Sequence, residues 1–146
     1  MKRLALLVLL AAAAACTRPE APAAGPAQGG ATLARWEAQG LRSYRFDLDR
    51  HCFCVETARE PVTVTVRDGR VAEVRSRRTG ATMQPTANLS WPTVSELLRQ
   101  VDEARAAGTE ARVEFHASGY PTEVEIGSLA ADAGIRYNLA NLVLLR

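Results

Sequence analysis

The sequence predicts a small α+β domain in which two helices pack on one face of an antiparallel sheet, with the element order αβββαβββ. Two segments carry apolar residues three or four positions apart, as helices do, and six others carry them at every second position, as strands do. Short stretches of turn-forming residues connect successive strand-like segments. Strands joined by short turns pair antiparallel, and two amphipathic helices can cover one face of the resulting sheet while the other faces water.

The first half of this pattern begins with a short helix. Leu33 and Trp36 fall on one helical face and Gly40 ends the segment, so Trp36 is expected to be a core residue. Strands of period two follow, and their predicted buried residues are Tyr44, Phe46 and Leu48, then Val62, Val64 and Val66. Asp68-Gly69 supplies the two positive φ positions of a tight hairpin turn, which returns the chain through 71–74.

The second half begins with the main helix. Thr93 and Glu96 have the spacing of a capping box, and Gly108 follows the last apolar position as a helix end. The predicted apolar stripe consists of Val94, Leu97, Leu98, Val101 and Ala104. Three more strands follow, with apolar positions at Ala111, Val113 and Phe115, at Val124 and Ile126, and at Ile135, Tyr137 and Leu139.

Residues 1–15 have the features of a signal peptide. Lys2 and Arg3 form a basic start, and an uncharged apolar run of twelve residues follows, Leu4–Ala15. A membrane-spanning helix needs roughly 20 apolar residues, so this run is too short to remain as a span. It closes on the letters AAAC, which resemble the lipobox of bacterial lipoproteins and make Cys16 the predicted lipidated N-terminus. An ordinary Ala-x-Ala signal peptidase site is the alternative.

Residues 16–31 form the predicted lipidated cysteine and flexible tether. The segment 17–31 holds three prolines, three glycines and no large apolar residue, so it cannot build a core. Acyl chains on Cys16 would anchor the protein without a spanning helix, because each buried methylene contributes about 0.8 kcal/mol. At about 3.3 Å per residue the tether reaches roughly 50 Å. We therefore expect a secreted, membrane-anchored lipoprotein of the cell envelope.

Residues 32–146 are expected to form one domain. Without Lys2 and Arg3, sixteen of the eighteen basic residues remain against sixteen acidic ones, so the mature chain is formally neutral. A neutral chain lacks the electrostatic support for binding nucleic acid, and no nucleic-acid partner is expected. The expected partners are the membrane, through the lipid anchor, and an unidentified envelope component.

Cys52 and Cys54 leave three interpretations open. Continued alternation from Tyr44 places both on the buried face, where residues i and i+2 lie about 6.6 Å apart, so a disulfide requires a local bend. An oxidising envelope favours that bond, and reduced core cysteines are the second interpretation. The third is a metal site that recruits His51 or His116, although both histidines fall on polar faces.

Several of these segments together resemble a known family. They are Trp36, Tyr44-Arg45-Phe46 leading to Cys52-Phe53-Cys54, the hairpin around Asp68-Gly69, the run from Thr93 to Leu98, and Gly119-Tyr120-Pro121-Thr122. In this order they resemble the domain of unknown function 6174, a family largely of bacterial secreted or lipid-anchored proteins. The resemblance covers nearly the whole mature domain and implies one α+β domain, with no activity attached. The acidic stretch expected after the fifth strand is reduced here to Asp132.

The residues do not form a catalytic pattern. Asp47 and Asp49 lie on a polar strand face, and we recognise no nucleophile paired with a base and no ligand set of three. The expected function is therefore a non-enzymatic binding or structural module without a cofactor. Tyr120, in the Gly-Tyr-Pro corner, is its candidate exposed contact. A thiol-based metal-binding or redox site at Cys52 and Cys54, with His51, is the alternative.

Overall fold

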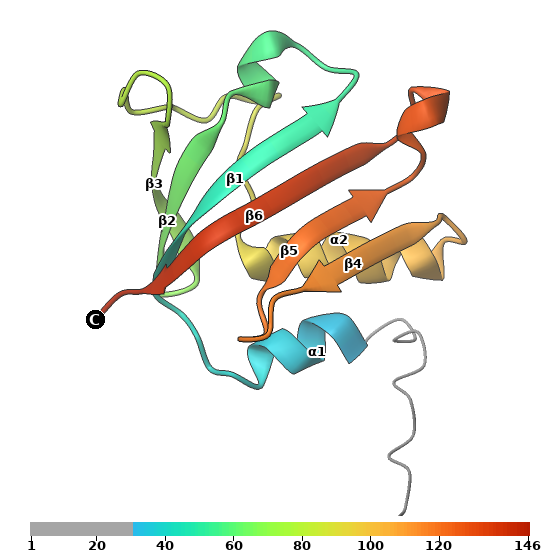
Figure 1. Ribbon diagram of the computed structural model, residues 1–146, viewed down its shortest axis with the longest axis horizontal. Coiled ribbons are helices and arrows are strands. Elements are labelled where there is room, and N and C mark those ends of the chain that lie inside the picture. The colour runs from blue at the N-terminus through green and yellow to red at the C-terminus, as the bar shows by residue number, and fades with distance from the viewer. Residues whose placement is uncertain (1–30) are drawn as a thin grey trace, which may run out of the picture.

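The computed structural model describes residues 31–146, so the predictions for the signal segment, for Cys16 and for the tether fall outside the described residues. Six strands form one antiparallel sheet in the spatial order β3-β2-β1-β6-β5-β4 (Figure 1). The strands are β1 (Tyr44–Cys52), β2 (Val62–Arg67), β3 (Arg70–Ser76), β4 (Ala111–Phe115), β5 (Pro121–Ile126) and β6 (Ile135–Leu144).

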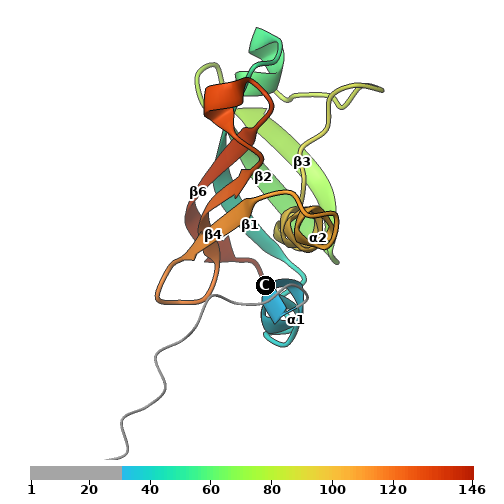
Figure 2. The same ribbon diagram turned by 90° about the vertical axis from the view of Figure 1, so that its right-hand side faces the viewer.

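The helical part of the described chain is small. Helix α2 (Val94–Ala106) has thirteen residues, whereas α1 (Ala31–Glu37) has seven. Two single turns of 3-10 helix, η1 (Glu56–Arg59) and η2 (Leu129–Ala131), complete the elements. Figure 2 shows α2 against one face of the sheet, and α1 below α2, near the lower end of the sheet in this view.

The predicted α+β arrangement with two helices packed on one face is wrong. The molecule is mainly a six-stranded antiparallel sheet with one substantial helix. At 1.5 Å per residue, α1 is only about 10 Å long, too short to cover several strands, and it packs against α2. Its chain turns away at Gly40, which has φ 67° and donates its N–H to the Glu37 carbonyl.

Helix α2 begins and ends as predicted. The Thr93 hydroxyl accepts the Glu96 N–H at 3.1 Å, and the Glu96 carboxylate accepts the Thr93 N–H at 2.7 Å. This capping box satisfies two amides that no helical carbonyl can reach. Gly108, with φ 78°, follows the C-cap Ala107. Both predicted helix signals are confirmed.

The predicted hairpin between β2 and β3 is also confirmed. Asp68 and Gly69 have φ values of 50° and 78°, as a tight hairpin turn with two positive φ positions requires. In contrast, β1 pairs with β6, which lies more than eighty residues away in the sequence. This long-range pair forms the centre of the sheet.

The core lies between α2 and one face of the sheet. Its fully buried residues include Tyr44, Phe46, Leu48, Val62, Val64, Val66, Val94, Leu97, Leu98, Val101 and Val124. Trp36 is buried as predicted, packs edge-on against Tyr44 at 5.5 Å between ring centroids, and donates from Nε1 to Ser95 Oγ at 3.2 Å. Among the described residues, no helix is long and apolar enough to cross a membrane.

Candidate functional site

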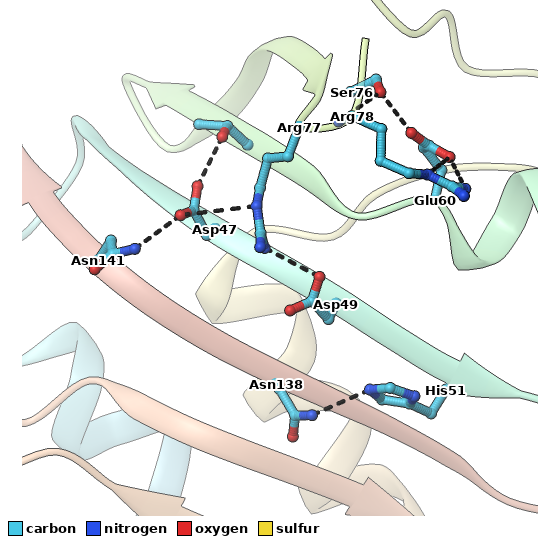
Figure 3. A network of polar contacts seen from close by, with 10 residues as sticks. Asp47, Asp49, His51, Glu60, Ser76, Arg77, Arg78, Asn138 and Asn141 are labelled. Carbon is cyan, nitrogen blue, oxygen red and sulfur yellow. Dashed lines mark hydrogen bonds and ion pairs between the residues drawn. The ribbon is translucent and has the colours of Figure 1, made fainter. Parts of the chain in front are cut away.

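A polar network covers the sheet face opposite α2 (Figure 3). Asp47, on β1, accepts hydrogen bonds from Thr63 Oγ1 at 2.7 Å and from Asn141 Nδ2 at 2.9 Å. Arg77, just beyond β3, donates to Asp49 at 3.0 Å and also approaches Asp47 at 3.9 Å. The network therefore ties the central strands to the turn after β3.

Asn141 reaches Asp47 because of a bulge in β6. Its φ is 54°, in the left-handed region that Asn tolerates better than most residues, and the β1–β6 register shifts between Arg45 and Asp47. Both oxygens of Asp47 consequently have neutral or cationic donors. A carboxylate held in this way ties three segments of the sheet together.

A second polar cluster lies at the end of β3, also in Figure 3. Glu60 accepts the Ser76 hydroxyl at 2.5 Å and the Arg78 Nε at 2.9 Å. The hydrogen bond from Arg78 is the largest cause of the lowered pKa of Glu60, followed by that from Ser76. Glu60 therefore stays ionised and fixes the turn that follows β3.

The cysteines lie where β1 ends, and a disulfide joins Cys52 to Cys54. Their Cα atoms are 5.3 Å apart, closer than the spacing of a regular strand, because the chain bends after Cys52. The bend turns the Phe53 side chain outward until it is 85% exposed, and Val55 is 71% exposed. We call residues 52–55 the disulfide tip.

The predicted metal ligands do not come together. Both sulfur atoms are in the disulfide, and His51 Nε2 pairs with Asn138 Nδ2 at 3.1 Å on the outer face. Within residues 31–146, no group of three or more His, Cys, Asp or Glu side chains is arranged to hold a metal ion. The interpretation of Cys52, Cys54 and His51 as a thiol-based metal site has no support here.

Tyr120 lies in the turn between β4 and β5. Gly119, with φ 90°, lets the chain reverse, and His116 N–H donates to the Tyr120 carbonyl at 2.9 Å. The Tyr120 ring stacks on His116 at 4.8 Å between centroids and is half-buried. His116 itself accepts the Ser118 N–H at Nδ1, at 3.1 Å, within the same turn. The binding role of Tyr120 stays a prediction.

An open groove of about 820 Å³ runs between β3 and α2. One wall is the edge strand, residues 69–74, and the other is α2, at Glu96, Arg99 and Gln100. Residues 82–85 and 90–92 close it at the sides, with Trp91 buried at the base. We call this the β3 groove. Arg50 helps to position its loop by donating to the Ser90 carbonyl at 2.6 Å.

Sequence reasoning named a Cys52–Cys54 disulfide as one interpretation, but it missed the exposure of Phe53 at the tip and the β3 groove. A signal for the tip was present, because Phe53 is an apolar residue at a position where the alternation from Tyr44 demands a polar one. The groove has no such signal. Its walls come from β3, α2 and the loop between them, which adopts no regular structure that a pattern could indicate.

Comparison with known proteins gives a family and no activity. The profile of the Family of unknown function (DUF6174) matches residues 29–144, which is most of the chain. No curated protein and no solved structure matches the chain. The match includes all six strands, both helices and the disulfide tip. The chain therefore belongs to the Family of unknown function (DUF6174).

Proposed function

We propose that this protein is a lipid-anchored, non-enzymatic binding module of the cell envelope, and that the disulfide tip is its contact with a partner protein. The observation that carries the proposal is the exposed Phe53, held between two bonded cysteines. Large exposed aromatic side chains are favourable contact residues, since their burial in a partner contributes about 1.5–3 kcal/mol. A bend closed by a disulfide presents such a side chain with little conformational freedom left to lose.

The disulfide also supports an envelope location. Such bonds persist in oxidising compartments and are rare in the cytosol. This agrees with the signal-like start of the sequence and with lipidation at Cys16. Attachment through Cys16 would leave the membrane on the N-terminal side of the domain.

The position of the tip supports contact with something other than the anchoring membrane. Figures 1 and 2 show α1, where the described chain begins, at one end of the molecule, and the end of β1 with η1 at the other. Phe53 and Val55 therefore lie at the end remote from Ala31. A tether of roughly 50 Å leaves this end free to meet a partner.

Anchoring is tested by fractionating cells that make the full chain or its Cys16→Ser variant. The chain with Cys16 should sediment with membranes, whereas the variant, which offers no thiol for acylation, should appear in the soluble envelope fraction. Equal membrane association of the two proteins would contradict lipid anchoring.

Contact through the tip is tested by placing a photoreactive phenylalanine analogue at position 53 or at position 143 in cells. Val143 is a matched control, because it is 46% exposed and lies near the other end of the molecule, in β6. A discrete adduct is expected from position 53 alone. Equal labelling from both positions, or none from position 53, would refute the proposal.

The energetic role of Phe53 is tested once that adduct identifies a partner. Phe53→Ser should weaken binding roughly 10- to 100-fold, which corresponds to the burial energy of one phenylalanine. Val143→Ser should leave the affinity unchanged.

A further inference from the structure

We propose that the β3 groove binds an extended peptide, which adds to the sheet as a seventh strand on the outer edge of β3. The proposal goes beyond the function of the disulfide tip and does not depend on it. It rests on the backbone geometry of β3, on the shape of the groove and on its balance of charge.

The protein already places one extended segment on this edge. Ser76 N–H donates to the Ala81 carbonyl at 2.9 Å, and Met83 N–H donates to the Val74 carbonyl at 2.8 Å. These bonds flank an antiparallel bridge between Arg75 and Thr82. The outer edge of β3 is therefore able to pair, and the chain's own segment occupies only its last part.

The rest of the edge faces the groove. Beyond Met83 the chain leaves β3, and residues 70–74 continue along the groove wall. A bulge lies within this stretch, because Thr65 pairs with Glu73 whereas Val66 pairs with Val71. The regular part of the free edge is therefore short and is centred on Val74. Because the carbonyl of Val74 points outward, the N–H of the same residue does so too, and an added strand can use it.

The opposite edge of the sheet has a side chain bonded to one of its outward groups. On β4, the Ala111 carbonyl accepts hydrogen bonds from Arg105 Nε at 3.1 Å and from Arg105 Nη2 at 3.0 Å. A side chain from α2 therefore occupies an outward group of that edge strand, a common protection against unwanted pairing. At the β3 edge, in contrast, the structure has a groove of about 820 Å³.

The groove walls define the chemistry of the peptide. Val71, which is 37% exposed, and the half-buried Met83 supply apolar surface, so we expect apolar side chains at alternate positions of the peptide. The charged lining residues are two of each sign, Arg70 and Arg99 against Glu73 and Glu96. This balance gives no net attraction for a polyanion and fits a peptide of low net charge.

Selection of peptides tests the proposal on the full-length chain, with a phage-displayed library of random heptapeptides as the probe. We expect enriched sequences with apolar residues at alternate positions. The substitution Val71→Lys, in the groove wall, should lower the affinity of the protein for the selected peptides at least tenfold. Val143→Lys is the matched control, because Val71 and Val143 are both partly exposed strand residues, at 37% and 46%. The Val143→Lys variant should bind the peptides as tightly as the unmodified chain does.

Strand addition itself is tested by N-methylating alternate amides of a selected peptide. Methylation of the set that faces β3 should abolish binding, and methylation of the other set should not. Hydrogen exchange of the Val74 amide should slow when the unmodified peptide binds.

Four results would overturn the proposal. They are the absence of any enriched peptide, binding that survives Val71→Lys in a variant that retains its melting temperature, binding that tolerates both methylated sets, and a concentration-dependent dimer of the chain that Val71→Lys dissociates. The last result would assign the groove to a second copy.

Discussion

Tyr44 connects the start of β1 to the start of α2, and its hydroxyl can be removed without disturbing the ring. The side chain is 1% exposed, and its oxygen accepts the Val94 N–H at 3.2 Å. That amide lies in the first turn of α2, where no helical carbonyl is available. Tyr44→Phe should therefore lower the free energy of unfolding at neutral pH by about 1–3 kcal/mol, the cost of a buried donor without an acceptor.

The same substitution should change how stability depends on pH. Burial is the largest cause that raises the pKa of Tyr44, from 10.0 to about 12, while the Val94 hydrogen bond opposes it. Between pH 10 and pH 12 the unfolded chain loses the phenol proton and the folded chain keeps it, so this contribution is intact below pH 10 and is lost as the pH rises. A pKa difference of about 2 corresponds to about 2.7 kcal/mol.

Urea unfolding at pH 9 and at pH 11.5, followed by far-ultraviolet circular dichroism, measures this difference. The unmodified chain should lose about 2 kcal/mol more than the Tyr44→Phe variant over that range, because the folded-state pKa of about 12 lies above pH 11.5 and the full difference is not yet reached. Tyr120→Phe, which removes a half-buried phenol from the turn between β4 and β5, is the control and should keep the slope of the unmodified chain. An equal loss in the Tyr44→Phe variant would refute the assignment.

Two further predictions concern hydrogen bonds of the core. Thr93→Ala removes the N-cap of α2 and should lower the free energy of unfolding by about 1 kcal/mol in urea titrations, whereas Thr93→Ser should restore most of it. Trp36→Phe should cost more stability than Trp91→Phe in the same assay, because Trp36 Nε1 donates to Ser95 while the buried Trp91 Nε1 has no partner among the described residues. The reverse order for the two tryptophans would show that ring packing dominates over the hydrogen bonds.

Local features of this protein could be predicted from the sequence because neighbouring residues create them. The capping box of Thr93 and Glu96 needs only a hydroxyl and a carboxylate three residues apart. The turn at Asp68-Gly69 needs only two residues that tolerate positive φ. Alternation of period two likewise predicted which side chains of β1 and β2 face the core.

The role of the first helix could not be predicted in this way. Leu33 and Trp36 show a helical face, but the pattern does not say whether that face lies on a sheet or beside another helix. The distinction depends on length, because a helix of seven residues has surface for few neighbours. Here Trp36 inserts between Tyr44 and Ser95, which lie in segments remote from it in the sequence.

The candidate sites likewise have some features that the sequence determines and others that depend on tertiary packing. The sequence by itself determined that Cys52 and Cys54 are close, that a bond between them needs a bend, and that residues 4–146 hold equal numbers of acidic and basic residues. Only the tertiary structure decided that the bend exposes Phe53, that β3 is an edge, and that α2 stands away from it to leave a groove. Turns and caps depend on adjacent residues, whereas edges and grooves depend on which distant segments pack together, and that choice is made by the whole core at once.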